Sequence, residues 1–185
     1  AGLGVAVAQS ILGLVYRSIQ VTIDEMGKVQ GEKAAWGAVA RHPERRTVDG
    51  VLVLRLSGPI FWANAATVVD EIALAVVDHP GTRVLILDLE ATNQLDTTTV
   101  DRLAALLTRL RSEGVDLYLV RVFEDVRTVM TRSGFMADLD PTGRMWHSIS
   151  AGVRAARKAI RAAGPEGVPV PVLEACVRDA LNFNP

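Results

Sequence analysis

The chain has 185 residues, which leaves room for one ordinary domain and a short appendage, since domains cluster near about 100 to 150 residues. Hydrophobic residues make up 49% of it and charged residues 22%, so it can bury a core, and an intrinsically disordered chain is excluded. Its formal net charge of -1 gives no electrostatic reason to expect a nucleic acid, because domains that bind nucleic acids concentrate Lys and Arg on one surface. We therefore predict no nucleic-acid partner.

The residue types that usually hold metals or perform catalysis are sparse. Cys176 is the single cysteine, so an intramolecular disulfide and a zinc site with several cysteines are excluded. His42, His79 and His147 are far apart, with no second ligand at metal-binding spacing. The chain also lacks the Gly-rich loops that cradle phosphates and the Gly-x-Ser-x-Gly motif of many hydrolases. We predict no metal, no cofactor and no enzymatic activity.

The first 16 residues carry no charge. A membrane-crossing helix needs about 20 apolar residues, so this run is either the last part of such a helix or a buried helix of a soluble protein. A secretory signal is not indicated, because the first basic residue, Arg17, follows the apolar run instead of preceding it. Lys28 and Lys33 extend this basic flank, which favours placing the following residues on the cytoplasmic side of a membrane.

The next part of the chain is expected to be a linker followed by short strands. Residues 19–34 mix charges of both signs without a sustained helical or strand period, which predicts a linker. Residues 36–41 predict a short strand, and the β-rich run 51–56 predicts a strand that turn residues end. Asn64 is then expected to cap a helix that continues to residue 78.

The second half of the chain alternates strands with helices. Residues 84–89 are almost continuously apolar, as in a strand that helices cover on both faces, and we expect this strand in the centre of a sheet. Such alternation predicts an α/β fold with a largely parallel sheet and right-handed crossovers. The remaining predicted elements are a helix with Val100, Leu103, Leu107 and Leu110 on one face that ends at Gly114, a strand at 115–120, a helix at 123–133 and a last helix at 148–163.

An acidic residue and three hydroxyls stand where a predicted strand passes into a helix: Asp96, Thr97, Thr98 and Thr99. Thr98 with Asp101 three residues later forms a capping-box pattern, so this corner can simply be a helix cap. The same geometry also attracts anions, and a hydroxyl placed there can be phosphorylated. Both interpretations stay open at this point.

The last predicted helix carries a basic stripe, with Arg154, Arg157, Lys158 and Arg161 recurring at i, i+3, i+4 and i+7. These cations lie opposite an apolar stripe on the same helix. Such a stripe can meet acidic lipid headgroups or a partner, or it can be an ordinary solvated face of an amphipathic helix. The apolar stripe consists of Ile149, Val153, Ala156 and Ile160.

Three stretches of the sequence together match the pattern of a known family. The first is Gly50-Val-Leu-Val-Leu-Arg-Leu-Ser-Gly-Pro-Ile-Phe-Trp-Ala-Asn64-Ala, an apolar strand with an arginine followed by a helix start. The second is the passage from strand to helix at residues 89–103, and the third comprises Tyr16-Arg-Ser and Met26-Gly-Lys-Val. These stretches resemble the cytoplasmic STAS domain carried by anion transporters of the sulfate permease (SulP) family and the exit from their last membrane helix.

The resemblance implies a division of the chain into four parts. Residues 1–18 would be the C-terminal part of a transmembrane helix and residues 19–34 a linker. Residues 35–163 would form a STAS fold, a mixed, mostly parallel β-sheet flanked by helices, and residues 164–185 a C-terminal extension. The family implies a place on the cytoplasmic face of the bacterial inner membrane, with the membrane domain of the same transporter as partner, in a homodimeric parent protein.

Two functions follow from this resemblance. The first is a non-catalytic regulatory and assembly domain of a SulP-type sulfate or anion transporter. The alternative is a soluble partner-switching module, similar to anti-sigma-factor antagonists, that is phosphorylated at Thr97 or Thr98 and so releases a protein partner. The family also suggests weak nucleotide binding, for which the sequence offers only a helix N-terminus and no loop that cradles a triphosphate.

Overall fold

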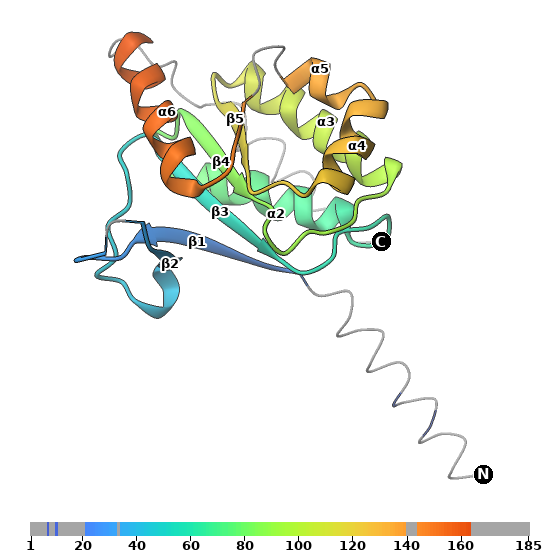
Figure 1. Cartoon of the computed structure of the whole chain (residues 1–185), viewed down its shortest axis with the longest axis horizontal. Helices are drawn as coiled ribbons and strands as arrows, with labels where there is room; N and C mark the ends of the chain where they lie inside the picture. The colour runs from blue at the N-terminus through green and yellow to red at the C-terminus, as the bar shows by residue number, and fades with distance from the viewer. Residues whose placement is uncertain (1–6, 8–9, 11–20, 33, 140–143, 164–185) are drawn as a thin grey trace.

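The computed structural model describes residues 7, 10, 21–32, 34–139 and 144–163 (Figure 1). A six-stranded sheet with the order β2-β1-β3-β4-β5-β6 forms its centre. Strands β3 to β6 are parallel, whereas β1 is antiparallel to both of its neighbours, β2 and β3. The predicted α/β fold with a mixed, mostly parallel sheet is therefore confirmed. The strands are β1 Thr22–Lys28, β2 Trp36–Ala38, β3 Val51–Ser57, β4 Val84–Asp88, β5 Asp116–Val120 and β6 Met145–Trp146.

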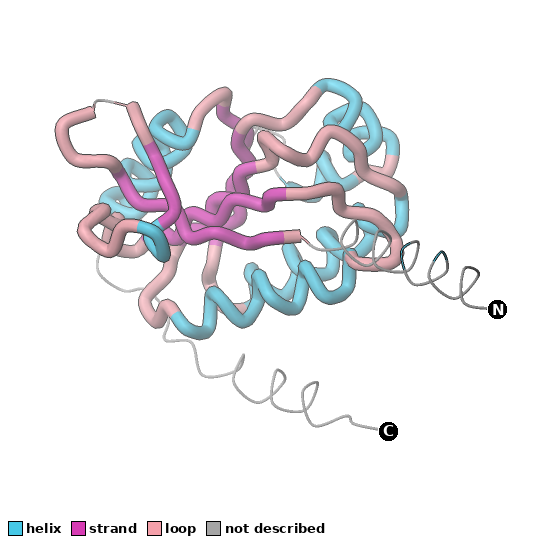
Figure 2. The backbone as a smooth tube through the Cα atoms, turned by 90° about the horizontal axis from the view of Figure 1, so that it is seen from below, coloured by secondary structure: helices cyan, strands magenta, loops and turns pink. Residues whose placement is uncertain are grey.

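Helices cover both faces of this sheet, as Figures 1 and 2 show. Helices α2, α3, α4 and α5 lie on one face, and α6 lies on the other. The two faces follow from the period of two in the central strand β4, where Leu85 and Leu87 face the first group while Val84 and Ile86 face α6. The helices are η1 Val39–Arg41, α2 Ala65–Asp78, α3 Thr97–Ser112, α4 Glu124–Arg132, α5 Phe135–Leu139 and α6 Ile149–Ala163.

Helix α6 approaches the sheet closely through a glycine. A Cβ atom added to Gly152 would lie 2.9 Å from Val120 Cγ1 and 3.5 Å from Ile86 Cδ1. Because a real Cβ atom does not come so near to another carbon, only glycine allows α6 to lie this close to β4 and β5. The predicted apolar stripe is confirmed at Ile149, Val153 and Ala156, which are buried, and Ile160 is half-buried.

The expected linker over residues 19–34 is wrong for residues 22–28, which form β1. This strand pairs with β3 from Thr22 opposite Ser57 to Glu25 opposite Leu54. The neighbouring carboxylates Asp24 and Glu25 break the alternation of apolar and polar residues that would indicate a strand. Both side chains are nevertheless half-buried in β1. Pairing with β3, which is distant in sequence, therefore decides the conformation. The domain boundaries themselves stay predictions.

Two expected segments fall outside the described residues. The predicted membrane segment 1–18 is described only at Val7 and Ser10, and the predicted extension 164–185, with Cys176, is not described. Among the residues that the structure does describe, no helix has both the length and the apolar character needed to cross a membrane.

Candidate functional site

The parallel strands β3, β4 and β5 end together at one edge of the sheet, which we call the carboxyl edge. In open α/β sheets this edge is where ligands and partners usually bind, because the loops that follow the strands meet there. Strand β1 begins at the same edge, since Thr22 at its start pairs with Ser57 at the end of β3. The Asp96 corner, which we define as Trp62, Asp96, Thr97 and Thr98, lies on the loops of this edge.

Asp96 is the N-cap of α3 and joins two loops. Its Oδ1 atom accepts a hydrogen bond of 2.7 Å from the backbone N–H of Thr99, and its Oδ2 atom accepts one of 2.7 Å from the backbone N–H of Trp62. The predicted capping box of Thr98 and Asp101 is wrong by two positions. Asp96 still has extended backbone angles, whereas α3 already begins at Thr97, so Thr98 cannot act as the cap.

The same hydrogen bonds set the charge state of Asp96. Partial burial opposes ionisation of this carboxyl, but the N–H groups of Thr99 and Trp62 stabilise the carboxylate and prevail, so the pKa of Asp96 lies below its ordinary value of 3.8. The side chain is therefore an anion throughout the physiological pH range. It is a fixed negative acceptor between the loop after β3 and the start of α3.

The three consecutive threonines that follow Asp96 differ in accessibility. Thr97 and Thr98 are exposed, whereas Thr99 is only 1% exposed and its hydroxyl has no hydrogen-bond partner among the described residues. A kinase can therefore reach the first two hydroxyls and not the third. This restricts the candidate modification site to Thr97 and Thr98.

The loop between β3 and α2 holds an exposed aromatic beside this corner. Asn64 was expected to cap α2, but its side chain forms no cap bond and instead closes the preceding loop. Asn64 accepts a hydrogen bond of 2.9 Å from the Phe61 N–H and donates one of 3.0 Å to the Pro59 carbonyl. Trp62, held between these contacts and Asp96, is 72% exposed.

A buried ionic network at the same edge could not be predicted from local patterns. Asp88, at the end of β4, is fully buried and accepts hydrogen bonds from Arg55 Nε at 2.7 Å and from Arg121 Nε at 2.8 Å. Arg121 also contacts Glu90 at 2.6 Å. The one indication of this network in the sequence is Asp88 itself, because a carboxylate in an apolar strand requires paired cations.

Arg121 adopts a left-handed backbone conformation, with φ of 56°. Residues other than glycine rarely do so, and the conformation costs energy that surrounding contacts have to offset. The ion pairs with Asp88 and Glu90 supply such contacts. They fix the point at which the chain leaves β5 and turns toward α4.

The predicted basic stripe is exposed on α6, and its four members line one groove together with Lys28 of β1. This groove lies toward the other end of the sheet, because Ile160 of α6 approaches Gly50, which precedes β3. The stripe and the Asp96 corner therefore form two separate surfaces. The four members are Arg154, Arg157, Lys158 and Arg161.

Two of the three histidines contact carboxylates. His42 lies 3.0 Å from Glu44, and His79 lies 3.2 Å from Glu25 and 2.7 Å from the Ala75 carbonyl. Within the described part of the chain, no three His, Cys, Asp or Glu side chains are grouped so that they could hold a metal ion.

Comparisons with known proteins agree with this architecture. The model of the STAS domain family matches residues 42–149. A Mycobacterium tuberculosis protein named "Probable sulfate transporter Rv1739c" is 30% identical over 165 residues, which cover 85% of this chain and 29% of that protein. The chain spans less than a third of the length of this protein and of two sulfate transporters from Arabidopsis thaliana that it also matches.

Two solved structures share the fold. The murine Slc26a9 anion transporter in the inward-facing state superposes with a TM-score of 0.72 at 22% identity, covering 85% of this chain and 25% of that one. The STAS domain of a SulP transporter from Vibrio cholerae superposes with a TM-score of 0.53 at 19% identity, covering 67% of this chain and 94% of that one. The chain belongs to the STAS domain family and is homologous to sulfate transporters of the SulP type.

Proposed function

We propose that this chain is the non-catalytic cytoplasmic domain of a bacterial SulP-type sulfate or anion transporter, and that it acts in assembly and regulation. The identity of 30% to the mycobacterial protein named as a sulfate transporter supports the transporter class. One structural observation carries the role: Thr22, the first residue of β1, lies at the carboxyl edge, on whose loops the Asp96 corner also lies. A membrane segment preceding Thr22 would bring this edge next to the membrane domain.

In this function the Asp96 corner is the contact surface for the membrane domain of the same dimeric transporter. Trp62 is the anchor, because large aromatics that are exposed in a free domain and then buried in an interface contribute most to binding. Asp96 holds the backbone of Trp62 in place through a 2.7 Å hydrogen bond. A movement in the membrane domain is thereby passed to α3, whose first turn bonds the same carboxylate.

The test places Trp62→Ala in the full-length parent transporter and measures sulfate uptake and dimer content in membranes. We expect both to fall, with the isolated domain as stable as before. Leu74→Ala on α2 is the matched control, because Leu74 is 36% exposed and lies away from the corner, and it should leave both unchanged. Removal of residues 35–185 should impair transport more severely; unchanged uptake and dimer content in that truncation would refute the proposal.

A second candidate function is partner switching by phosphorylation. The exposure of Thr97 and Thr98 at the first turn of α3 favours it, because the helix N-terminus stabilises added negative charge. Asp96 opposes that charge at close range. The test is peptide mass spectrometry of the protein purified from its own cells, with a Thr97→Ala/Thr98→Ala variant as control. Phosphate on either threonine supports the switch, and its absence under all growth conditions counts against it.

A further inference from the structure

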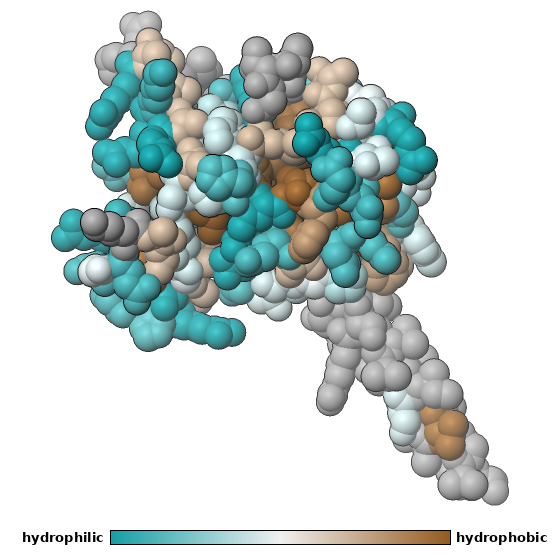
Figure 3. Space-filling view, in the orientation of Figure 1, coloured by the Kyte–Doolittle hydropathy of each residue, from teal (hydrophilic) through white to brown (hydrophobic). Residues whose placement is uncertain are grey.

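A groove between α6 and the β1–β2 hairpin collects five cationic side chains. We call it the basic groove and define it by Lys28 of β1 and the four cations of the α6 stripe. Its volume of about 720 Å³ lies within the range of about 300 to 1,000 Å³ that is common for ligand sites. Trp36, Ser148 and Ser150 also line it, and none of the carboxylates that the structure describes does. Hydrophilic side chains gather over this part of the molecule in Figure 3.

Among the described residues, the cations of the basic groove have no acidic partner. Within the described residues, none of the five lies within 4.0 Å of a carboxylate, whereas the arginines of the carboxyl edge are paired with Asp88 and Glu90. Five like charges around one hollow repel each other, and the repulsion is relieved when an anion occupies the space. The groove is thus poised for a ligand of strong negative charge.

The walls of the groove are held in place before any ligand arrives. Trp36 of β2 donates a hydrogen bond of 2.9 Å from its indole N–H to Ser150 Oγ, which ties the hairpin to α6. Ser148 Oγ accepts one of 3.2 Å from the Ala151 N–H at the start of this helix. Gly152 lets the helix lie directly on the sheet. A site fixed in this way loses little entropy when it binds.

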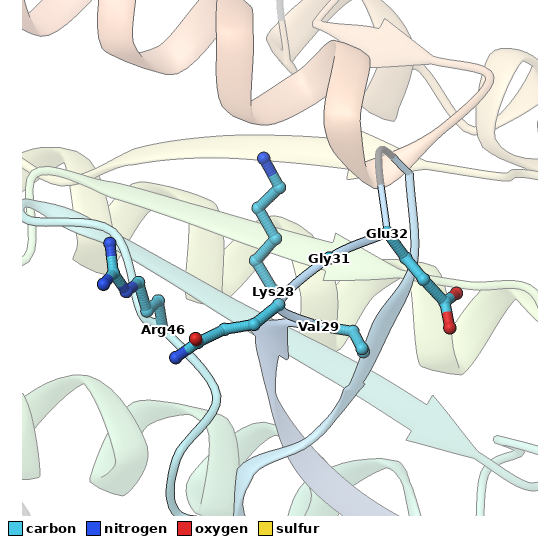
Figure 4. Close-up of a pocket in the computed structure, with 6 residues that line it drawn as sticks. Lys28, Val29, Gly31, Glu32 and Arg46 are labelled. Carbon is cyan, nitrogen blue, oxygen red and sulfur yellow. The ribbon is translucent and has the colours of Figure 1, made fainter.

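The spacing of the cations selects for an elongated anion. Arg154 and Arg161 are seven residues apart on α6, which separates them by about 10 Å along the helix axis. A single phosphate group is too small to contact both. Lys28 faces them from the hairpin, and Figure 4 shows its side chain extending toward α6, while Arg46 and Glu32 point elsewhere. A chain of anionic groups laid along α6 meets all five cations.

We propose that the basic groove binds a soluble linear polyphosphate chain. Three of its five cations are arginines, whose planar forks match phosphate oxygens better than an ammonium group does. A chain of phosphate groups carries a charge on every unit, so it can follow the stripe from Arg154 to Arg161. The choice of a soluble anion over a lipid headgroup rests on the proposed function, because the groove lies at the end of the sheet away from Thr22 and hence from the membrane.

The test uses the 185-residue chain in neutral detergent and titrates it with sodium polyphosphate, following tryptophan fluorescence and heat. We expect saturable binding that weakens steeply with salt, with little response to orthophosphate. The double variant Arg157→Gln/Lys158→Gln should bind at least about tenfold more weakly. Trp36→Phe should lose most of the fluorescence change, because Trp36 lines the groove, and this would locate the ligand there.

The matched control is Arg102→Gln/Arg132→Gln, which removes two exposed arginines from α3 and α4 outside the groove and should bind as the parent chain does. Absence of polyphosphate binding, or equal binding by both double variants, overturns the proposal. Polyglutamate bound as tightly as polyphosphate would overturn the phosphate assignment. Phosphatidylglycerol in mixed detergent micelles, bound in place of polyphosphate, would assign the groove to a membrane surface. None of these outcomes depends on transport, so they stay separable from the proposed function.

Discussion

Two aspartates at the carboxyl edge show how position decides what a carboxylate does. Asp96 lies at the surface, where it accepts two backbone N–H groups and joins two loops. Asp88 is fully buried and pairs with two arginines, one in β3 and one directly after β5. The first stabilises a helix end and presents an anion to solvent. The second holds the ends of three parallel strands together.

Substitution of Asp96 by alanine tests the observed cap. We expect Asp96→Ala to lower the free energy of unfolding by about 1 to 2 kcal/mol at pH 7, because two backbone donors lose their acceptor. The lowered pKa of Asp96 means that this contribution is complete above the ordinary value of 3.8 and is lost as the pH falls through the folded-state pKa. Urea unfolding followed by circular dichroism at pH 7 and pH 3 measures the difference, which should shrink in acid.

Asp101 is the matched control for the cap. It is exposed and belongs to the capping box that the sequence pattern predicted. Asp101→Ala should change stability by less than about 0.5 kcal/mol, as surface substitutions usually do. A loss as large as that of Asp96→Ala would mean that the helix is capped in the predicted register and not in the observed one.

Substitution of Asp88 tests the buried network. Asp88→Asn keeps the shape of the side chain and removes the charge between Arg55 and Arg121, and we expect a loss of about 3 kcal/mol. Glu90→Gln removes the outer carboxylate, which is 53% exposed, and should cost less than about 1 kcal/mol. Chemical denaturation at pH 7 compares the two. Equal small effects would show that the network is not a structural element of the edge.

At the scale of elements, β1 is the part whose conformation depends most on the rest of the molecule. Its residues alternate poorly, and two neighbouring carboxylates, Asp24 and Glu25, suggest a solvated segment. Yet β2 pairs with one side of the strand and β3 with the other. Pairing on both sides satisfies its backbone N–H and C=O groups, which no local pattern reports. The short elements α5 and β6 also escaped prediction, because five and two residues are too few to show a helical or strand period.

Met26 tests whether β1 is an integral strand. Met26 is 2% exposed and packs in the core between the sheet and α6. We expect Met26→Ala to reduce the free energy of unfolding by about 2 to 4 kcal/mol through lost burial and a residual cavity. Thr22→Ala, at the exposed start of the same strand, is the control and should have little effect. If thermal and urea unfolding do not distinguish the two variants, β1 behaves as the linker that its sequence pattern indicates.

At the scale of the whole molecule, the layered fold could be predicted because the residue pattern of its inner strands indicates burial on both faces. Residues 84–89 are apolar except for Asp88, and β4 does lie between β3 and β5 with helices on both faces. The periodic stripes of α3 and α6 likewise marked the sides that are buried. These patterns involve residues close together in the sequence, so a single sequence is enough to predict the buried strand and the buried helix faces.

The candidate sites could be predicted only where their residues lie close together in the sequence. The Asp96 corner and the α6 stripe are contiguous or periodic in sequence, so both could be named. The basic groove has no local pattern, because Trp36 and Ser150 are 114 residues apart and Lys28 belongs to β1, whose sequence pattern predicts a linker. The Asp88 network joins residues 33 apart on either side. Chemistry assembled by the fold leaves no pattern in a single sequence.

The placement of β1 has a mechanical consequence. The strand lies inside the sheet between β2 and β3, and the chain reaches it at Thr22, while α6 returns to the opposite end of β3, about 20 Å away. A pull between Thr22 and the end of α6 runs along the strands, so it loads the hydrogen bonds between β1 and β3 together in shear instead of opening them one at a time. Tension applied to the chain before Thr22 would therefore be transmitted to α6 without separating β1 from β3.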